Sequence, residues 1–198
     1  MKKLIIALAV LVLGSLPVSA ETTVQRTELQ PAETQSADVD EAKKRIQVFS
    51  KTLKSKLKAA ISEGGLSKGI SVCKTQAPKI AADLSTDGWH VSRTSLKTRN
   101  PLNVPDEWEL ETLKYLESEK ALGSDFKALN KTQYKNNKFR YMQAIPTGGL
   151  CLSCHGKNLS DEVKTALGTH YPSDQATGFK LGDIRGAFSL EKEYLESL

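Results

Sequence analysis

The stretch Cys151-Leu152-Ser153-Cys154-His155 is the one place in this 198-residue chain with the spacing Cys-x-x-Cys-His. This spacing is the attachment signature of a c-type haem. Two thiols separated by two residues reach the two vinyl groups on one edge of a porphyrin and form thioether bonds with them. The histidine that follows then offers an imidazole nitrogen to the iron. The motif therefore predicts one covalently attached haem c, with His155 as the proximal iron ligand.

Two other interpretations of the motif fit less well. A structural zinc site has four ligands, usually with a second Cys/His pair at a set spacing, and the sequence contains no such pair. A thioredoxin-like redox pair does not need the histidine and normally opens a helix after a strand. Glycines flank the motif at positions 148, 149 and 156, and a backbone without side chains lets a macrocycle approach closely. The sequence thus favours haem.

The first twenty residues have the pattern of a secretory signal peptide. Lys2 and Lys3 precede an apolar run over 4–13, and small residues close the segment at 18–20. The run is too short to span a bilayer, and no cysteine follows it that could carry a lipid anchor. The pattern predicts cleavage after Ala20 and export to a bacterial periplasm, where c-type haem is attached. No later stretch is long and apolar enough to predict a membrane span.

The net charge argues against a nucleic-acid partner. The whole chain carries +5, and removing Lys2 and Lys3, the charged residues of the signal segment, leaves +3. Such a small excess, with no basic run interleaved with aromatic residues, is typical of an ordinary solvated surface with a weak preference for acidic partners. The expected partner is a redox or signalling protein, whose identity the sequence does not reveal. The oligomeric state also stays open.

The hydrophobic pattern predicts a disordered polar tether over 21–37 and a single domain over 38–198. Apolar residues three or four apart indicate a helix from Asp40 that ends at Gly64-Gly65. Ser67 is expected to cap a second helix, in which Pro78 introduces a kink or a restart. Strands are predicted over 89–95, 139–145, 179–180 and 184–190. Two more helices are predicted to begin after the N-cap residues Asp106 and Ser160. Helices before strands favour an α+β fold with an antiparallel sheet.

Cys73 has no cysteine partner once Cys151 and Cys154 are bound to haem. A free thiol in an oxidising compartment is a liability unless something occupies it. It is either a small buried hydrophobic residue or a thiolate that binds the iron opposite His155. In the second case the small apolar helix face that includes Ile70 and Ala77 packs on the porphyrin.

Other side chains compete with Cys73 for the sixth iron position. Met142 is the methionine that remains after the signal segment, and His90 and His170 are the other imidazoles. Met142 is most simply a core residue of a strand, His170 a loop residue and His90 a sheet residue. The residues themselves leave Cys73 and Met142 as the two main candidates.

Basic side chains are candidates for binding the two haem propionates: Arg93, Lys97, Arg99, Arg140 and Arg185. Arg99 and Arg140 are preferred, because both lie next to proline-bounded turns near the haem motif. Lys97 is expected to be a solvated surface charge, and Tyr141 a core residue.

Several segments together resemble a known family. They read SVC and AP within 71–78, RTSLK and RNP within 93–101, N and PDEW within 103–108, RYM and AIP within 140–146, CLSCHG at 151–156, and YP, GF and GDIRGA within 171–187. Over residues 40–190 the chain resembles the single-haem c-type cytochromes catalogued as a domain of unknown function. The resemblance implies a PAS-like antiparallel sheet with N-terminal helices and a His155–Cys73 ligand pair. Family members occur free-standing or as sensor parts of membrane signalling proteins, and this chain resembles the free-standing form.

A thiolate ligand has a consequence for redox chemistry. Its negative charge next to the iron disfavours the addition of an electron in a low-dielectric pocket. The expected function is therefore low-potential electron transfer or redox sensing. An alternative is a haem-based gas sensor in which Cys73 dissociates on reduction. A haem enzyme such as a peroxidase has less support, because no motif provides an acid–base histidine near the iron.

Overall fold

The computed structural model describes residues 32–194. The predicted signal peptide and the predicted tether up to residue 31 lie outside these residues. The tether prediction is wrong for 32–37, because helix α1 (Ala32–Leu84) already begins there. Asp38 is buried in this helix and accepts a hydrogen bond from Lys192 Nζ at 2.7 Å. This buried ion pair ties the start of α1 to the end of the chain.

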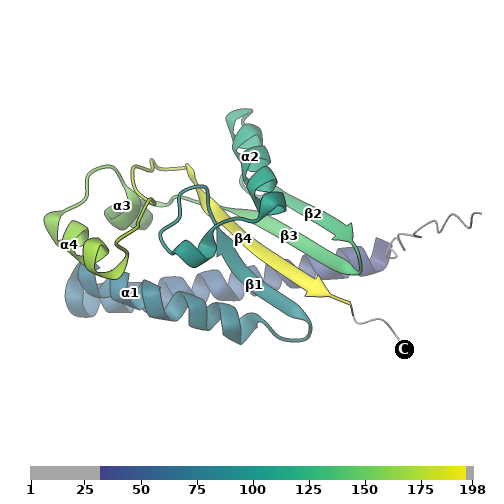
Figure 1. Ribbon diagram of the computed structural model, residues 1–198, viewed down its shortest axis with the longest axis horizontal. Coiled ribbons are helices and arrows are strands. Elements are labelled where there is room, and N and C mark those ends of the chain that lie inside the picture. Colours follow the sequence, from purple (N-terminus) through teal and green to yellow (C-terminus); the bar gives the residue numbers. More distant parts are fainter. Residues whose placement is uncertain (1–31, 195–198) are drawn as a thin grey trace, which may run out of the picture.

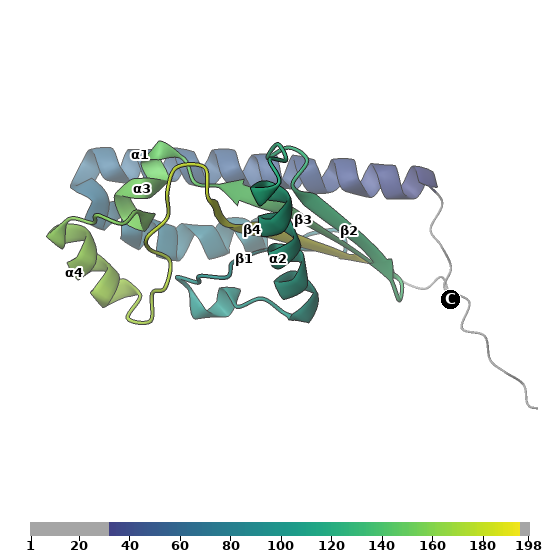
Figure 2. The ribbon, with the colours of Figure 1, turned by 90° about the horizontal axis from the view of Figure 1, so that it is seen from above.

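Helix α1 is a hairpin of two arms rather than one rod (Figures 1 and 2). The backbone leaves helical geometry at Gly64 and Gly65, and Gly65 has a φ of +70°, which glycine adopts without steric cost. The second arm runs back against the first so closely that a Cβ at Gly69 would lie 2.9 Å from Ile61. The predicted helix end at Gly64-Gly65 is confirmed. The second arm continues through Pro78 without non-helical residues.

The second arm of α1 receives its N-terminal cap from another helix. The Ser67 backbone N–H donates to Glu162 Oε1 at 3.0 Å. Glu162 lies in the first turn of α4 (Asp161–His170). The expectation that Ser67 provides the cap is wrong, because the helical break at Gly65 already places Ser67 inside the first turn.

The sheet within residues 32–194 has four antiparallel strands in the order β1-β4-β3-β2. They are β1 (Trp89–Thr94), β2 (Asn130–Lys135), β3 (Lys138–Pro146) and β4 (Ile184–Glu193). The predicted α+β class and antiparallel sheet are confirmed. The helices and strands interleave along the chain, however, and the predicted strand over 179–180 is wrong. Phe179 forms only an isolated bridge with Gly156.

Both faces of the sheet are covered (Figure 1). The α1 hairpin covers one face, and α2 (Glu107–Ala121) covers the other. Asp106 caps α2 with a full capping box, as predicted, and Ser160 caps α4, also as predicted. The core on the α1 side includes Ile46, Phe49, Ala77, Phe139, Tyr141, Phe188 and Leu190, and the core on the α2 side includes Leu113, Leu116, Leu129, Met142 and Ala187.

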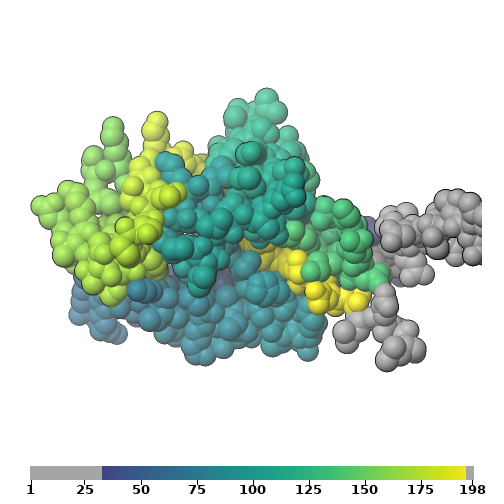
Figure 3. Space-filling model, viewed as in Figure 1, coloured from purple at the N-terminus to yellow at the C-terminus, as the bar shows by residue number. Residues whose placement is uncertain are grey.

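The haem motif lies beyond the end of the sheet, in the short helix α3 (Gly149–His155). Figure 2 shows α3 and α4 together at the end of the molecule where α1 turns. In the space-filling view, the green-to-yellow segment from α4 towards β4 covers this end (Figure 3). The turn η1 (Pro101–Asn103) follows β1 on the way to α2. The fold therefore collects three separate segments around the motif in α3: the second arm of α1, the chain after β1, and the loop before β4.

Candidate haem site

The motif cysteines are presented by one helix. Cys151 and Cys154 are one turn apart in α3, and both are partly buried free thiols. Gly156 ends this helix, and a Cβ there would lie 2.5 Å from the Leu152 carbonyl oxygen. The helix end itself thus requires this glycine. Nothing lies within 4 Å of the Cβ position at Gly149.

The imidazole of His155 is held by the backbone of a distant loop. Its Nδ1 lies 2.7 Å from the carbonyl oxygen of Ala176. Arg185 Nε lies 3.0 Å from the same nitrogen. A carbonyl oxygen only accepts and its contact is the shorter, so we assign the proton to Nδ1. Nε2 then keeps its lone pair, which is the arrangement typical of metal-binding histidines.

Electrostatics keeps this imidazole neutral. Burial, followed by the positive charges of Arg185 and Arg99, lowers the pKa of His155 well below its ordinary value of 6.5. A neutral imidazole is the form that binds a metal ion. The Nε2 atom faces Arg99 Nη1 at 3.4 Å, so a metal at Nε2 would replace this contact.

Three guanidinium groups gather around the motif, but only one has a carboxylate partner. Arg99 Nε and Nη2 donate to the two oxygens of Asp174, each at 3.1 Å. Among residues 32–194, Arg93 and Arg185 form no ion pair, and the Arg93 guanidinium lies over the Phe49 ring at 5.0 Å. Burial and the neighbouring arginine charges lower the pKa of Arg185 to about 10. The site therefore carries two positive charges more than its carboxylate balances.

Cys73 lies on the second arm of α1 within electrostatic range of the motif. Burial raises the pKa of its thiol above 9.0, while the charges of Arg93, Arg99 and Arg185 act in the opposite direction. The nearby Cys151 raises the pKa of the Cys73 thiol further. The structure thus brings together the early cysteine, the motif and the arginines, which are far apart in the sequence.

The two predicted packing residues next to Cys73 lie in different clusters. Ile70, one turn before it, is buried with the motif residue Cys154 and with Tyr171. Ala77, one turn after it, is buried in the main core with Phe188. Ile70 is therefore beside the motif, and Ala77 marks where this helix face continues into the core on the sheet.

Arg140 is not brought to the motif. Its Nη2 donates to Asp106 at 2.6 Å, and its Nε lies 3.5 Å from Glu191. Arg140 pairs in register with Glu191, towards the far end of β4, whereas Arg185, the neighbour of His155, is at the start of that strand. The alternation of β3 also turns the Arg140 side chain towards α2, on the other face from Tyr141.

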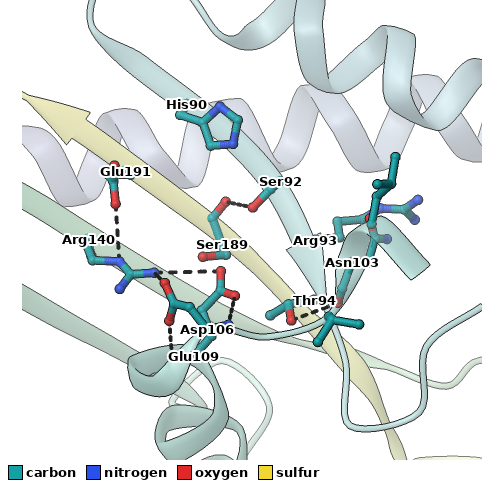
Figure 4. A pocket seen from close by; sticks show the side chains of 12 residues that line it. His90, Ser92, Arg93, Thr94, Asn103, Asp106, Glu109, Arg140, Ser189 and Glu191 are labelled. Atoms are coloured by element: carbon teal, nitrogen blue, oxygen red, sulfur yellow. Dashed lines mark hydrogen bonds and ion pairs between the residues drawn. The ribbon is translucent and has the colours of Figure 1, made fainter. Parts of the chain in front are cut away.

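Arg140 instead lines a polar cavity of about 230 Å³ between the sheet, η1 and the start of α2. Figure 4 shows its guanidinium among the carboxylates of Asp106, Glu109 and Glu191, with His90 on the neighbouring part of β1. His90 is exposed. His155 does not line this cavity, and of the three arginines near the motif only Arg93 does.

The remaining predicted residues do not contact the motif themselves. Met142 is fully buried in the core between the sheet and α2, as is expected of a strand residue. His170 ends helix α4 rather than lying in a loop. Lys97 is exposed, with its Nζ over the Phe179 ring at 5.3 Å. Tyr141 is fully buried in the core, as predicted.

Two contributors to the site escaped the sequence reasoning. Asp174 and Ala176 lie in a loop without regular structure between α4 and β4. Asp174 pairs with Arg99, and the Ala176 carbonyl accepts a hydrogen bond from the His155 N–H. A carbonyl group is present in every residue, so no sequence signal marks its role.

Comparison with known proteins assigns the chain to a family. The model of the Tll0287-like family matches residues 20–192. Among solved structures, the cyanobacterial heme-protein Tll0287 is similar, with a TM-score of 0.59 and 23% sequence identity. The match covers 85% of this chain and 99% of that chain, and at this identity it shows a shared fold. No curated protein matches the chain. Because the family model spans most of the sequence, the chain belongs to the Tll0287-like family.

Proposed function

We propose that this protein is a cytochrome that holds one haem c through thioether bonds from Cys151 and Cys154, with His155 and Cys73 as the axial ligands. The observation that carries the proposal is the His155 imidazole. Its Nδ1 is committed to the Ala176 carbonyl, and its Nε2 keeps a lone pair that a metal could bind in place of the 3.4 Å contact with Arg99. The similar cyanobacterial structure is titled a heme-protein, which supports the same cofactor here. Haem would supply a one-electron redox couple at this position.

The charge of the site fits the proposed cofactor. Of Arg93, Arg99 and Arg185, only Arg99 is paired with a carboxylate, Asp174, so two positive charges remain without an ion-pair partner among residues 32–194. Haem carries two propionate groups, each of which brings one negative charge. The Nε of Arg185 faces His155 Nδ1, which already carries a proton in our assignment. This N–H group of Arg185 therefore lacks an acceptor that a propionate could supply. We therefore propose these three arginines as the propionate partners in place of Arg140, which is paired with Asp106 and Glu191.

The proposed role is low-potential electron transfer or redox sensing in the periplasm. The thiolate of Cys73 would place a negative charge beside the metal, in a partly buried site where a further electron is disfavoured. The N-terminal signal pattern supports export, and thioether attachment of haem takes place after export. Within residues 32–194, no helix is long and apolar enough to cross a membrane.

Two experiments test the proposal. Protein purified from a host with working haem-attachment machinery should be coloured, and it should keep the colour after denaturing electrophoresis unless Cys151 and Cys154 are replaced by alanine. Electron paramagnetic resonance of the wild-type protein should show a low-spin thiolate signal that Cys73→Ser abolishes. Colourless protein would overturn the whole proposal. A thiolate signal that survives in Cys73→Ser would overturn only the assignment of Cys73 as the second iron ligand.

Carbon monoxide separates the proposed role from gas sensing. After reduction, rapid binding in a stopped-flow experiment indicates that Cys73 leaves the metal and favours a gas sensor. The absence of binding favours electron transfer, because the sixth position then stays closed. The Cys73→Ser variant is the matched control, since it lacks the thiolate from the start.

A further inference from the structure

The first arm of α1 carries a concentration of positive charge that the overall composition conceals. The segment 42–62 contains seven lysine and arginine residues and no aspartate or glutamate. It therefore carries +7, whereas the whole chain carries +5, so the rest of the chain is left with −2. The positive charge of the arm is thus concentrated in residues 42–62, between the acidic residues that precede and follow this segment.

Five of these side chains lie on one side of the arm: Lys43, Lys44, Lys51, Lys54 and Lys58. With 3.6 residues per turn, they fall within an arc of about 100° and extend over roughly 22 Å of helix. All five are exposed, and none forms an ion pair with any residue in the described part of the chain. We refer to these five residues as the lysine face.

The lysine face points away from the rest of the molecule. The opposite side of the same arm carries Ala42, Ile46 and Phe49, which are buried against the sheet. Figure 2 shows this arm as a straight rod along one long edge of the molecule. Arg45, at the flank, is occupied by Glu41 at 3.0 Å, and so it is not part of the face. The five ammonium groups are therefore free to meet a flat, negatively charged surface.

The chemistry of the face distinguishes between classes of partner. A specific protein interface has an apolar core inside a polar rim, but within 42–62 Val48, at 50%, is the one exposed large apolar side chain. Single-stranded nucleic acid is bound by stacking on aromatic side chains, and the exposed residues here include none. A lipid surface needs neither shape complementarity nor stacking, because lysines near anionic headgroups bind by charge alone.

We propose that the lysine face adsorbs the protein to a membrane surface rich in anionic phospholipid headgroups. The binding is peripheral and electrostatic, because no described helix can cross a bilayer. The haem motif lies at the hairpin turn, where Cys154 packs with Leu66 and Ile70, beyond the last lysine of the face. The arm therefore lies along the membrane while the end that holds the motif stays outside the contact. This inference does not depend on the proposed haem chemistry.

Sedimentation with vesicles tests the proposal on the full purified chain. Vesicles of phosphatidylcholine with 30% phosphatidylglycerol provide an anionic surface, and pure phosphatidylcholine provides a neutral one. Each lysine near an anionic surface strengthens binding by roughly fivefold. The protein should partition onto the anionic vesicles at low salt and not onto the neutral ones. Binding should fall steeply towards 0.5 M salt, where the screening length is only a few ångströms.

A matched pair of variants tests whether the lysine face, rather than net charge, is responsible for vesicle binding. The face variant replaces Lys43, Lys44, Lys51, Lys54 and Lys58 with glutamine, which preserves helix propensity. The control variant replaces five exposed lysines elsewhere with glutamine and has the same net charge: Lys114, Lys127, Lys135, Lys157 and Lys180. The face variant should lose at least a hundredfold in vesicle partitioning, and the control variant less than threefold. Circular dichroism checks that both variants keep their helices.

Three results would overturn the proposal. The wild-type protein could fail to bind anionic vesicles at low salt. The two variants could lose binding equally, which would show that net charge alone matters. The wild-type protein could also bind duplex DNA as tightly as the vesicles at equal salt, which would make the face a general polyanion site.

Discussion

Arg99 and Asp174 form a two-point ion pair that fastens the loop before β4 to the haem motif. Two guanidinium nitrogens lie 3.1 Å from the two carboxylate oxygens, and one of them also donates to the Cys154 carbonyl at 2.5 Å. Only 11% of the Arg99 side chain and 7% of the Asp174 side chain are exposed. The pair is thus screened little by solvent, and it holds the loop whose Ala176 carbonyl positions His155.

Removing the carboxylate should therefore be costly. We expect Asp174→Ala to lower the free energy of unfolding by about 3 kcal/mol, because a buried guanidinium loses its partner. Urea denaturation measures the change. The matched control is Asp83→Ala, which breaks the exposed pair with Lys79 and should cost less than about 1 kcal/mol. Equal losses in the two variants would show that the Arg99 pair is no more important than a surface contact.

The ligand at position 73 should control the redox potential. We expect a low midpoint potential for the wild-type protein and a shift of on the order of 100 mV to more positive values in Cys73→Ser, because a negative charge beside the metal is lost. Potentiometric titration followed by absorbance measures both. A clearly positive wild-type potential, or no shift in the variant, would contradict thiolate ligation.

Met142 provides the complementary test, because it is the main competing ligand. Its side chain is fully buried between the sheet and α2, among Leu113, Leu116 and Leu129. We expect Met142→Leu to cost less than about 1.5 kcal/mol in stability and to leave the paramagnetic resonance spectrum unchanged. Met142→Ala should cost about 2–5 kcal/mol and also keep the spectrum. A changed ligand signal in Met142→Leu would assign the sixth position to this residue.

Asp106 should stabilise the start of α2 in a pH-dependent manner. Burial raises the pKa of its carboxyl, but hydrogen bonds from Arg140 and from the Glu109 and Trp108 N–H groups outweigh this effect and hold the pKa below 3.8. The folded-state pKa is thus lower than the unfolded-state value. The stabilisation is complete above roughly pH 4 and is lost as the pH falls through the folded-state pKa.

The corresponding variant is Asp106→Ala. We expect it to cost about 1 kcal/mol at pH 7, the usual value of an N-cap side chain. Asp106→Asn keeps the cap but loses the charge, so it serves as the control. The difference between wild type and Asp106→Ala, measured by urea denaturation, should shrink as the pH falls below roughly 4. A difference that is constant from pH 7 to pH 3 would show that the ionised carboxylate contributes nothing.

The sequence alone predicted features that depend on residues close together in the chain. Gly64-Gly65 breaks a helix, and Asp106 and Ser160 cap the helices that follow them, because a cap or a break involves backbone groups within four positions. The strand β2 escaped prediction. It is an edge strand that carries mostly polar, partly exposed side chains, and so it lacks the alternation that marked β1, β3 and β4.

The tertiary structure decided which distant residues meet. The sequence favoured Arg140 over Arg185 as a propionate partner, but the strand register places Arg140 at the acidic cavity and Arg185 against His155. The role of the Ala176 carbonyl was equally invisible, because it depends on a loop conformation rather than on a side chain.

The motif 151–155 by itself predicted a site built on two thiols and an imidazole, since thioether attachment would need only their local spacing. The surroundings of that imidazole and the unbalanced arginine charges follow from packing alone. Each brings together groups from separate turns or separate elements, and only the folded chain sets the distances on which their electrostatic interactions depend.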